Sequence, residues 1–313
     1  MPALTARRFV AWSFWAACAG LACTGGSEPE PAPSLFGRVV FSRETPDTSF
    51  AIYLMTPEGT DIRLLKWVEG RALIIPRVSP DGQQIAVLTF PTGPLGGTQE
   101  PYIMNADGSD FRPLPNAFGG GPASWAPDGS RLAFACVDPF PPVGESSKAI
   151  CEINVDGSGL RRVNHSAFIS LSPAWSPDGL RIAYMSDSTG SALDIFTMSS
   201  AGSDVQQVTA TPWQESGPAW SPDGALLAFW RSGIGYGPSQ VLVIEPSGAG
   251  ELPVGAPAAA SFGPSWSPAG TEIWFSAGEQ LFAVGPDGTG LHQVTTSSRA
   301  AAWPSFGPEA VAR

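Results

Sequence analysis

One short sequence pattern returns along most of this chain and constrains its fold more than any other feature. Its clearest copy, residues 173–179, reads as a strand that runs into a tight turn. Pro177 presets the φ angle that the second position of a type I turn requires, Asp178 can bond back to its own backbone, and Gly179 accepts positive φ. Residues 180–186 then alternate between apolar and polar or small side chains, which is the period of a strand. The pattern therefore predicts a β-hairpin.

The copies of this turn recur at nearly constant spacing. They are named here by their prolines: Pro80, Pro127, Pro177, Pro222, Pro268 and, in a degenerate copy at the end of the chain, Pro308. Successive prolines are 47, 50, 45, 46 and 40 residues apart. A period of about 40 to 50 residues is typical of a repeat architecture. Because the copies cover nearly all of the chain, we expect one domain over residues 37–308.

Each repeat contains two further predicted strands after the hairpin, such as residues 194–198 and 207–209, so a repeat holds four strands. The two ends of the chain are incomplete in complementary ways. Residues 39–42 match a second strand with no first strand before it, and residues 304–308 supply a first strand with no second. Together they make a sixth unit, which closes a ring without exposed sheet edges. The sequence predicts an all-β fold, a six-bladed β-propeller closed by its N- and C-terminal strands.

The repeated residues resemble those of the TolB-like β-propeller family, whose repeats are WD40-like and of the PD40 type. The resemblance covers residues 37–308. It implies a non-enzymatic, monomeric scaffold that binds a protein or peptide partner in the bacterial cell envelope. It extends only to the propeller, since few residues precede residue 37 where TolB carries an α/β domain. Two alternatives stay open: a hydrolase or lyase with its site at the mouth of the propeller channel, and a structural envelope lipoprotein.

Residues 1–22 differ in kind from the repeats. Arg7 and Arg8 are followed by an almost uncharged run of about 14 residues, which is too short to span a bilayer core of about 30 Å. Such a run fits a secretory signal peptide. We therefore expect an exported protein, located in the periplasm or attached to the outer membrane.

The segment after this run favours a lipid anchor. Cys23 follows a small residue and opens a polar, Pro-rich stretch, residues 23–36, which is predicted to be a disordered linker. This arrangement resembles a bacterial lipoprotein with Cys23 as the lipidated residue, and the anchor would be the only contact with the membrane. Cys18 is a competing lipidation site, and a signal that is simply cleaved is the other alternative. Residues 309–313 are expected to form a short tail.

Charge and composition argue against several classes of function. The net charge of −11 falls to −13 once Arg7 and Arg8 are removed, which disfavours binding to nucleic acid. The chain has only two histidines and no Gly-x-Ser-x-Gly motif, and we expect no catalytic residue, metal or cofactor. The turn aspartates, such as Asp178, each stand alone rather than in the oxygen-rich group that calcium requires, so we interpret them as turn residues.

Four tryptophans occupy one equivalent position in successive repeats: Trp125, Trp175, Trp220 and Trp266. An aromatic cage for a ligand is one interpretation. Identical placement in successive blades is what packing between neighbouring sheets requires, and we predict packing.

Cys136 and Cys151 end and begin adjacent predicted strands of the third repeat. Antiparallel pairing of these strands would bring the two sulfurs together. In an oxidising compartment, a disulfide that closes a loop of about 15 residues contributes up to about 3 kcal/mol to stability. Two buried free thiols are the alternative.

The strand order divides the connections between two faces. The Ser-Pro-Asp-Gly and Asp-Gly turns all fall on one face, here called the turn face. The opposite loop face gathers the connections that vary in length and chemistry, and exposed aromatic and charged residues on such loops favour recognition of a partner. The alternative is that some of these rings plug the channel. The candidate binding residues on the loop face are Trp67, Arg71, Phe118, Phe168, Trp213, Glu215, Arg231 and Arg299.

Overall fold

The computed structural model describes most of the chain from Leu35 onward. The described residues are 35–47, 49–93, 97–117, 119, 121–137, 143–146, 148–188, 190, 192–232, 239–255 and 261–309. The predicted signal peptide, Cys18, Cys23 and most of the predicted linker lie outside them, as do residues 310–313.

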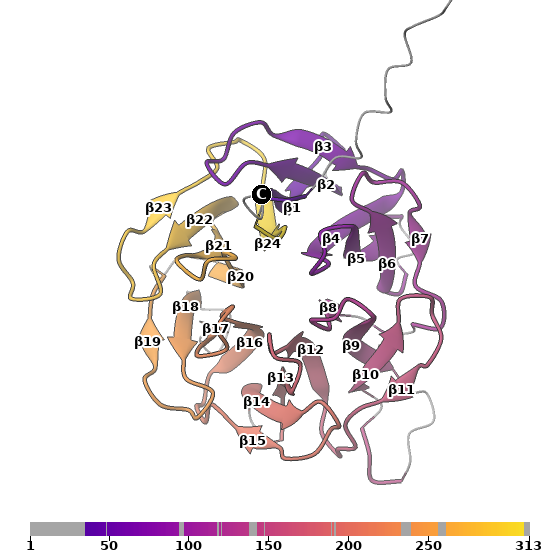
Figure 1. The fold of residues 1–313 in the computed structure, drawn as a ribbon, viewed down its shortest axis with the longest axis vertical. Helices are drawn as coiled ribbons and strands as arrows, with labels where there is room; N and C mark the ends of the chain where they lie inside the picture. The colour runs from indigo at the N-terminus through magenta and orange to yellow at the C-terminus, as the bar shows by residue number, and fades with distance from the viewer. Residues whose placement is uncertain are drawn as a thin grey trace, which may run out of the picture. The chain divides into compact units, whose positions relative to one another are not determined.

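The described residues form six four-stranded antiparallel sheets, which Figure 1 shows as blades around a central axis. From the inner to the outer strand, blade 1 is β24 (Ala301–Phe306), β1 (Val39–Glu44), β2 (Phe50–Met55) and β3 (Arg63–Lys66); blade 2 is β4 (Arg71–Val78), β5 (Gln84–Pro91), β6 (Glu100–Asn105) and β7 (Arg112–Pro113); and blade 3 is β8 (Ser124–Trp125), β9 (Arg131–Val137), β10 (Lys148–Asn154) and β11 (Arg161–Arg162). Blade 4 is β12 (Ser170–Trp175), β13 (Arg181–Ser186), β14 (Asp194–Ser199) and β15 (Gln206–Gln207); blade 5 is β16 (Gln214–Trp220), β17 (Leu227–Ser232), β18 (Ser239–Ile244) and β19 (Leu252–Pro253); and blade 6 is β20 (Ser261–Trp266), β21 (Ile273–Ala277), β22 (Gln280–Val284) and β23 (His292–Gln293). The predicted six-bladed propeller is confirmed.

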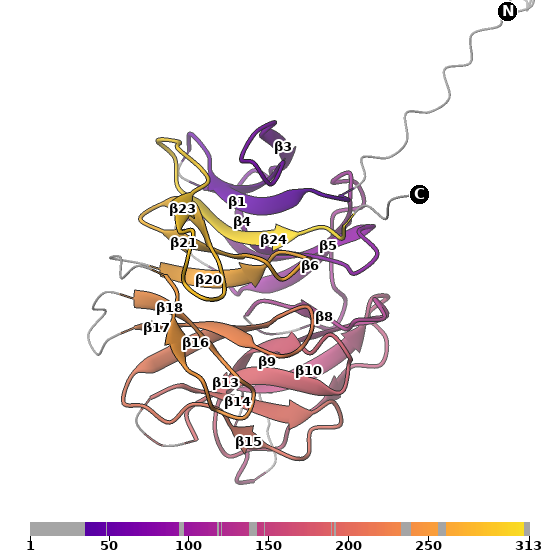
Figure 2. The same cartoon turned by 60° about the vertical axis from the view of Figure 1, so that its left-hand side comes forward.

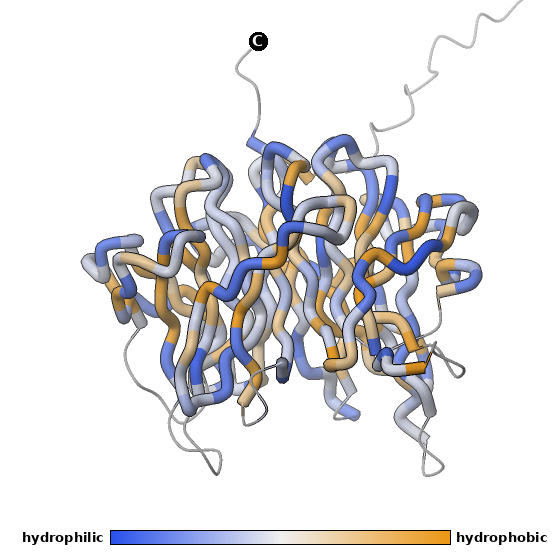
Figure 3. The backbone as a smooth tube through the Cα atoms, turned by 90° about the horizontal axis from the view of Figure 1, so that it is seen from below, coloured by the Kyte–Doolittle hydropathy of each residue, from blue (hydrophilic) through white to orange (hydrophobic). Residues whose placement is uncertain are grey.

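The two ends of the chain close the ring, as predicted. Strand β24 pairs with β1 in the register Val39↔Phe306, and the two strands lie side by side in Figure 2. Beyond the ladder, Gly37 N donates to Pro308 O at 3.0 Å. Leu35 is fully buried, so the packed propeller begins two residues before residue 37, where the sequence places its start. Both ends of the described chain lie on the turn face, at the top in Figure 3.

The repeated turns have the chemistry that their sequence predicts. Ser176 Oγ donates to Asp178 Oδ1 at 2.6 Å, and Asp178 Oδ1 also accepts from Leu180 N at 2.9 Å. Gly179 takes a φ of 71°, in the left-handed region that favours glycine. The same arrangement recurs around Asp223, with Ser221 as the hydroxyl donor. The interpretation of these aspartates as turn residues is confirmed.

These hydrogen bonds make the turns sensitive to acid. The hydroxyl bond from Ser176, followed by the backbone bond from Leu180, lowers the pKa of Asp178, and the Ser221 bond lowers that of Asp223. A lowered pKa contributes stability that is present above the unfolded-state value, near 3.9, and is lost as the pH falls through the folded-state value. We expect the melting temperature to change little between pH 7 and pH 5 and to fall below about pH 4.

The double variant Asp178→Asn and Asp223→Asn tests this expectation. Asparagine keeps the shape of the side chain but does not titrate, so the acid-induced fall in melting temperature should be smaller than in the unmodified protein by about 1 to 3 °C. Thermal unfolding followed by circular dichroism from pH 7 to pH 3 measures the difference. An equal fall in both proteins would show that these turns do not contribute.

Candidate functional site

The inner strands are bent by a bulge that lies just before the repeated turn. In β4 the register with β5 shifts between Ile74 and Arg77, and β12, β16 and β20 shift at the equivalent place. Ile75 and Ser172, which lie in these bulges, take φ values of 51° and 48°. A proline follows each of them, and its missing N–H is tolerated where the ladder is already broken. As a result, the residue three positions before the turn proline lines the central channel in every blade.

The repeated tryptophans pack between neighbouring blades. Trp125, Trp175 and Trp266 are buried, and Trp220 is half-buried. Three of the indole N–H groups bond to the preceding blade: Trp125 Nε1 donates to Arg77 O at 2.9 Å, Trp220 Nε1 to Ala174 O at 3.1 Å and Trp266 Nε1 to Ala219 O at 3.0 Å. The buried Trp175 Nε1 has no hydrogen-bond partner among the described residues. The prediction of packing is confirmed, although the rings also form part of the channel wall.

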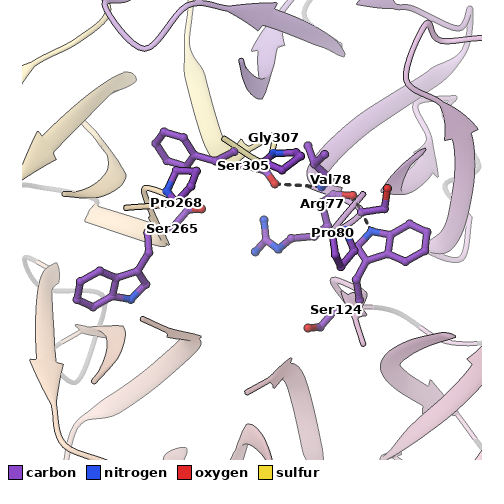
Figure 4. A pocket seen from close by; sticks show the side chains of 13 residues that line it. Arg77, Val78, Pro80, Ser124, Ser265, Pro268, Ser305 and Gly307 are labelled. Carbon is purple, nitrogen blue, oxygen red and sulfur yellow. Dashed lines mark hydrogen bonds between the residues drawn. The ribbon is translucent and has the colours of Figure 1, made fainter. Parts of the chain in front are cut away.

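Two adjoining cavities lie in the central channel. The first, of 330 Å³, opens among Ser79, Pro80 and Pro308 on the turn face. The second, of 240 Å³, lies among the inner strands of blades 3 to 6. They share Arg77, Ser124, Ser265 and Trp266 in their walls. In Figure 4 the side chain of Arg77 reaches into the space between the blades.

Sequence reasoning missed Arg77 as a site residue. The signal was present: the equivalent position holds serine or alanine in the other five blades. Removal from water lowers the pKa of Arg77 to about 10, so its guanidinium is still charged at neutral pH.

Three of the predicted binding residues are exposed aromatic side chains on the loop face. Trp67 is 44% exposed in the β3–β4 connection, Phe168 is 42% exposed in the β11–β12 connection, and Trp213 is 42% exposed in the β15–β16 connection. Arg299 is also exposed, between β23 and β24. The structure distributes these side chains around the rim, each on a different connection between blades. Phe118 lies outside the described residues.

Glu215 is not on the exposed surface, contrary to the prediction. It is the second residue of the inner strand β16 and is 0% exposed. Its Oε1 accepts from Arg231 Nε at 2.8 Å and from Thr211 Oγ1 at 2.8 Å. Arg231 also makes a two-pronged contact with Glu251, at 2.7 and 2.6 Å. The pair therefore joins strands within blade 5, and Glu215 is not accessible to a partner.

Arg71 is likewise held inside its own blade. Its guanidinium lies 5.0 Å from the centre of the Tyr102 ring and donates to Thr89 Oγ1 at 3.1 Å and Glu100 Oε2 at 3.4 Å. Because Arg71 begins β4, its side chain follows the sheet rather than the loop before it.

In the structure, Cys136 and Cys151 form a disulfide in blade 3, with their Cα atoms 5.6 Å apart. The bond links β9 to β10, whose register places Cys136 opposite Ala149 and Phe134 opposite Cys151. The two cysteines are 15 residues apart in the sequence, so the bond closes a loop of that length.

Among the residues that the structure describes, no three histidine, cysteine or acidic side chains come together as a metal site. The same part of the chain contains no helix that is long and apolar enough to cross a membrane.

Comparison with known proteins gives the family. The model of the TolB beta propeller domain matches residues 142–311. The Tol-Pal system protein TolB of Anaeromyxobacter dehalogenans is 33% identical over 111 residues, which cover 34% of this chain and 22% of that protein. Dipeptidyl-peptidase 5 of Porphyromonas gingivalis is 33% identical over 66 residues, 21% of this chain and 10% of that protein. The matched segments thus span about a fifth and a tenth of these relatives.

Solved structures support the same fold. TolB from Acinetobacter baumannii superposes with a TM-score of 0.73 at 17% identity, covering 87% of this chain and 67% of that chain. An oligogalacturonate lyase in complex with manganese gives a TM-score of 0.57 at 12% identity, covering 84% of this chain and 74% of that one. At these identities the likeness concerns the fold alone. Since the family model matches more than half of its residues, the chain belongs to the TolB beta propeller domain family.

Proposed function

We propose that this protein is a non-enzymatic scaffold of the cell envelope that holds a protein partner on its loop face. The observation that carries the proposal is the presence of three aromatic side chains, Trp67, Phe168 and Trp213, each more than 40% exposed on a separate connection of one ring. Aromatic residues dominate the energetics of protein interfaces, and connections between strands vary without disturbing the blades that hold them. Membership of the TolB family supports a binding role.

The proposal includes export. The predicted signal peptide over residues 1–22 and lipidation of Cys23 would place the propeller in the periplasm, attached to a membrane through the lipid alone. A net charge of −11 supports a protein partner rather than nucleic acid. A disulfide between Cys136 and Cys151 fits an oxidising compartment.

Alanine substitution of the three exposed aromatic residues tests the loop face. We expect Trp213→Ala to weaken partner capture at least tenfold, since truncation of a central interface aromatic costs about 2 kcal/mol or more. Trp67→Ala and Phe168→Ala should add to the loss. The measurement is crosslinking in intact cells followed by quantitative mass spectrometry of the proteins recovered with the propeller.

A matched control is available on the turn face. Leu180 is a large apolar residue that is 66% exposed, so Leu180→Ala removes a similar kind of surface from the opposite side. It should leave capture unchanged. If the triple aromatic variant retains full capture while remaining folded, the loop face is not the binding surface.

A further inference from the structure

We propose that the central channel binds the free carboxyl end of a peptide chain and that Arg77 is the residue that recognises its carboxylate. The site opens on the turn face, so it is distinct from the loop-face surface proposed above.

Arg77 is the one charged side chain in the described walls of the two cavities. The rest of the wall consists of serine, proline, glycine, alanine, valine and aromatic residues. Both cavities touch it, and Figure 4 shows its guanidinium projecting between the blades rather than into its own sheet. An arginine fork in a concave, mostly apolar pocket is suited to bidentate recognition of a carboxylate.

In the described part of the chain, Arg77 has no carboxylate counter-ion, whereas several other arginines do. Arg181 pairs with Asp204 at 2.6 Å and Arg231 with Glu215 at 2.7 Å, whereas no described carboxylate lies within 4.0 Å of Arg77. Among the described residues, its guanidinium makes one hydrogen bond, of 3.0 Å from Nη1 to Pro76 O. A half-buried charge without a partner is costly, and removal from water already lowers the pKa of this group to about 10. A bound anion offsets that cost.

Two hydroxyl groups in the wall supply further donors. Ser305 Oγ accepts from Val78 N at 3.1 Å, and Ser124 Oγ accepts from Trp175 N at 3.0 Å. Each oxygen is therefore fixed by a backbone donor, while its own hydrogen has no acceptor among the described residues. Both hydroxyls line the same cavity as Arg77 and can donate to a ligand.

The surroundings favour one carboxylate over a polyanion. The chain carries a net charge of −11, and the turns on the turn face carry carboxylates such as Asp81, Asp178 and Asp223. A ligand with many negative charges is repelled by this field, whereas a single carboxylate that pairs with Arg77 is less affected.

The wall also favours a peptide over a sugar acid. The described cavity walls include no asparagine, glutamine or histidine side chain that could bond the hydroxyls of a sugar ring. They do include Trp125, Trp266, Phe306 and Pro268, which suit the apolar side chains of a peptide.

Peptide binding to the whole protein tests this assignment. The probes are a pool of tetrapeptides with free carboxyl ends, the same pool as C-terminal amides, and trigalacturonate, each titrated against tryptophan fluorescence and calorimetry. We expect the free acids to bind at least ten times more tightly than the amides. Arg77→Gln should remove this preference at least tenfold, and Arg77→Lys should retain part of it.

Arg63→Gln is the matched control, because it removes an exposed arginine from the outer strand β3 and should change nothing. Equal binding of acids and amides, no binding at millimolar concentration, or an unaltered affinity in Arg77→Gln would each overturn the proposal, as would preferential binding of trigalacturonate. Loop-face capture is an independent readout: Arg77→Gln should preserve it, and Trp213→Ala should preserve peptide binding, so failure of either proposal is recognised separately.

Discussion

Replacing Arg231 with methionine is expected to lower the free energy of unfolding by about 3 to 5 kcal/mol. In the folded protein the arginine pairs with Glu215, whose side chain is fully buried, and with Glu251. Methionine fills much of the same volume but leaves the Glu215 carboxylate without its cation. An uncompensated buried charge is among the largest single costs that a substitution can introduce. Urea unfolding followed by fluorescence measures the change.

A double variant separates the charge from the packing. In Glu215→Leu with Arg231→Met both charged groups are replaced by apolar ones, and such replacements are often close to neutral. We therefore expect the double variant to regain most of the stability that Arg231→Met loses. A double variant as unstable as the single one would show that the geometry of the arginine, rather than its charge, matters in blade 5.

Trp125→Ala should also cost about 3 to 5 kcal/mol. The ring is buried in the core between blades 2 and 3, with Ile103 on one side and Leu132 on the other, and its indole donates to Arg77 O in blade 2. The substitution removes both the packing and the hydrogen bond from that ring to the neighbouring blade. Denaturant unfolding gives the size of the loss.

Two further tryptophan variants serve as comparisons for the loss of stability in Trp125→Ala. Trp125→Phe keeps most of the packing and loses the hydrogen bond, so we expect a cost of about 1 to 2 kcal/mol. Trp213→Ala removes a tryptophan that is 42% exposed and should change stability by no more than about 0.5 kcal/mol. If Trp125→Ala were as mild as Trp213→Ala, the repeated tryptophans would not hold the blades together.

The fold was predictable because its determinants are local and repeated. Pro177, Asp178 and Gly179 carry their turn chemistry wherever they occur, and six copies at one spacing define the number of blades. The closure of the ring could also be predicted from the sequence. The N-terminal end supplies a second strand and the C-terminal end a first strand, and the two can be matched without coordinates. The packing role of the tryptophans followed from the same regularity.

The candidate site was less accessible because it depends on departures from the repeat. Glu215 stands two residues after the exposed Trp213, and only the start of β16 at Gln214 turns one side chain outward and buries the other. Arg77 is a single arginine at a position where the other blades have serine or alanine. Its importance depends on the bulge in β4, which makes this position face the channel.

The closure of the ring also determines where the protein can be tagged or immobilised. Leu35 and Glu309 lie at the same face as Pro80 and Pro308, which surround the channel mouth. A fluorescent protein, affinity tag or surface tether joined directly to Leu35 or Glu309 would therefore stand beside that mouth and leave the opposite rim clear. Immobilised protein suits measurements on the connections that carry Trp213, whereas peptide titrations of the channel require the fusion to be cleaved first.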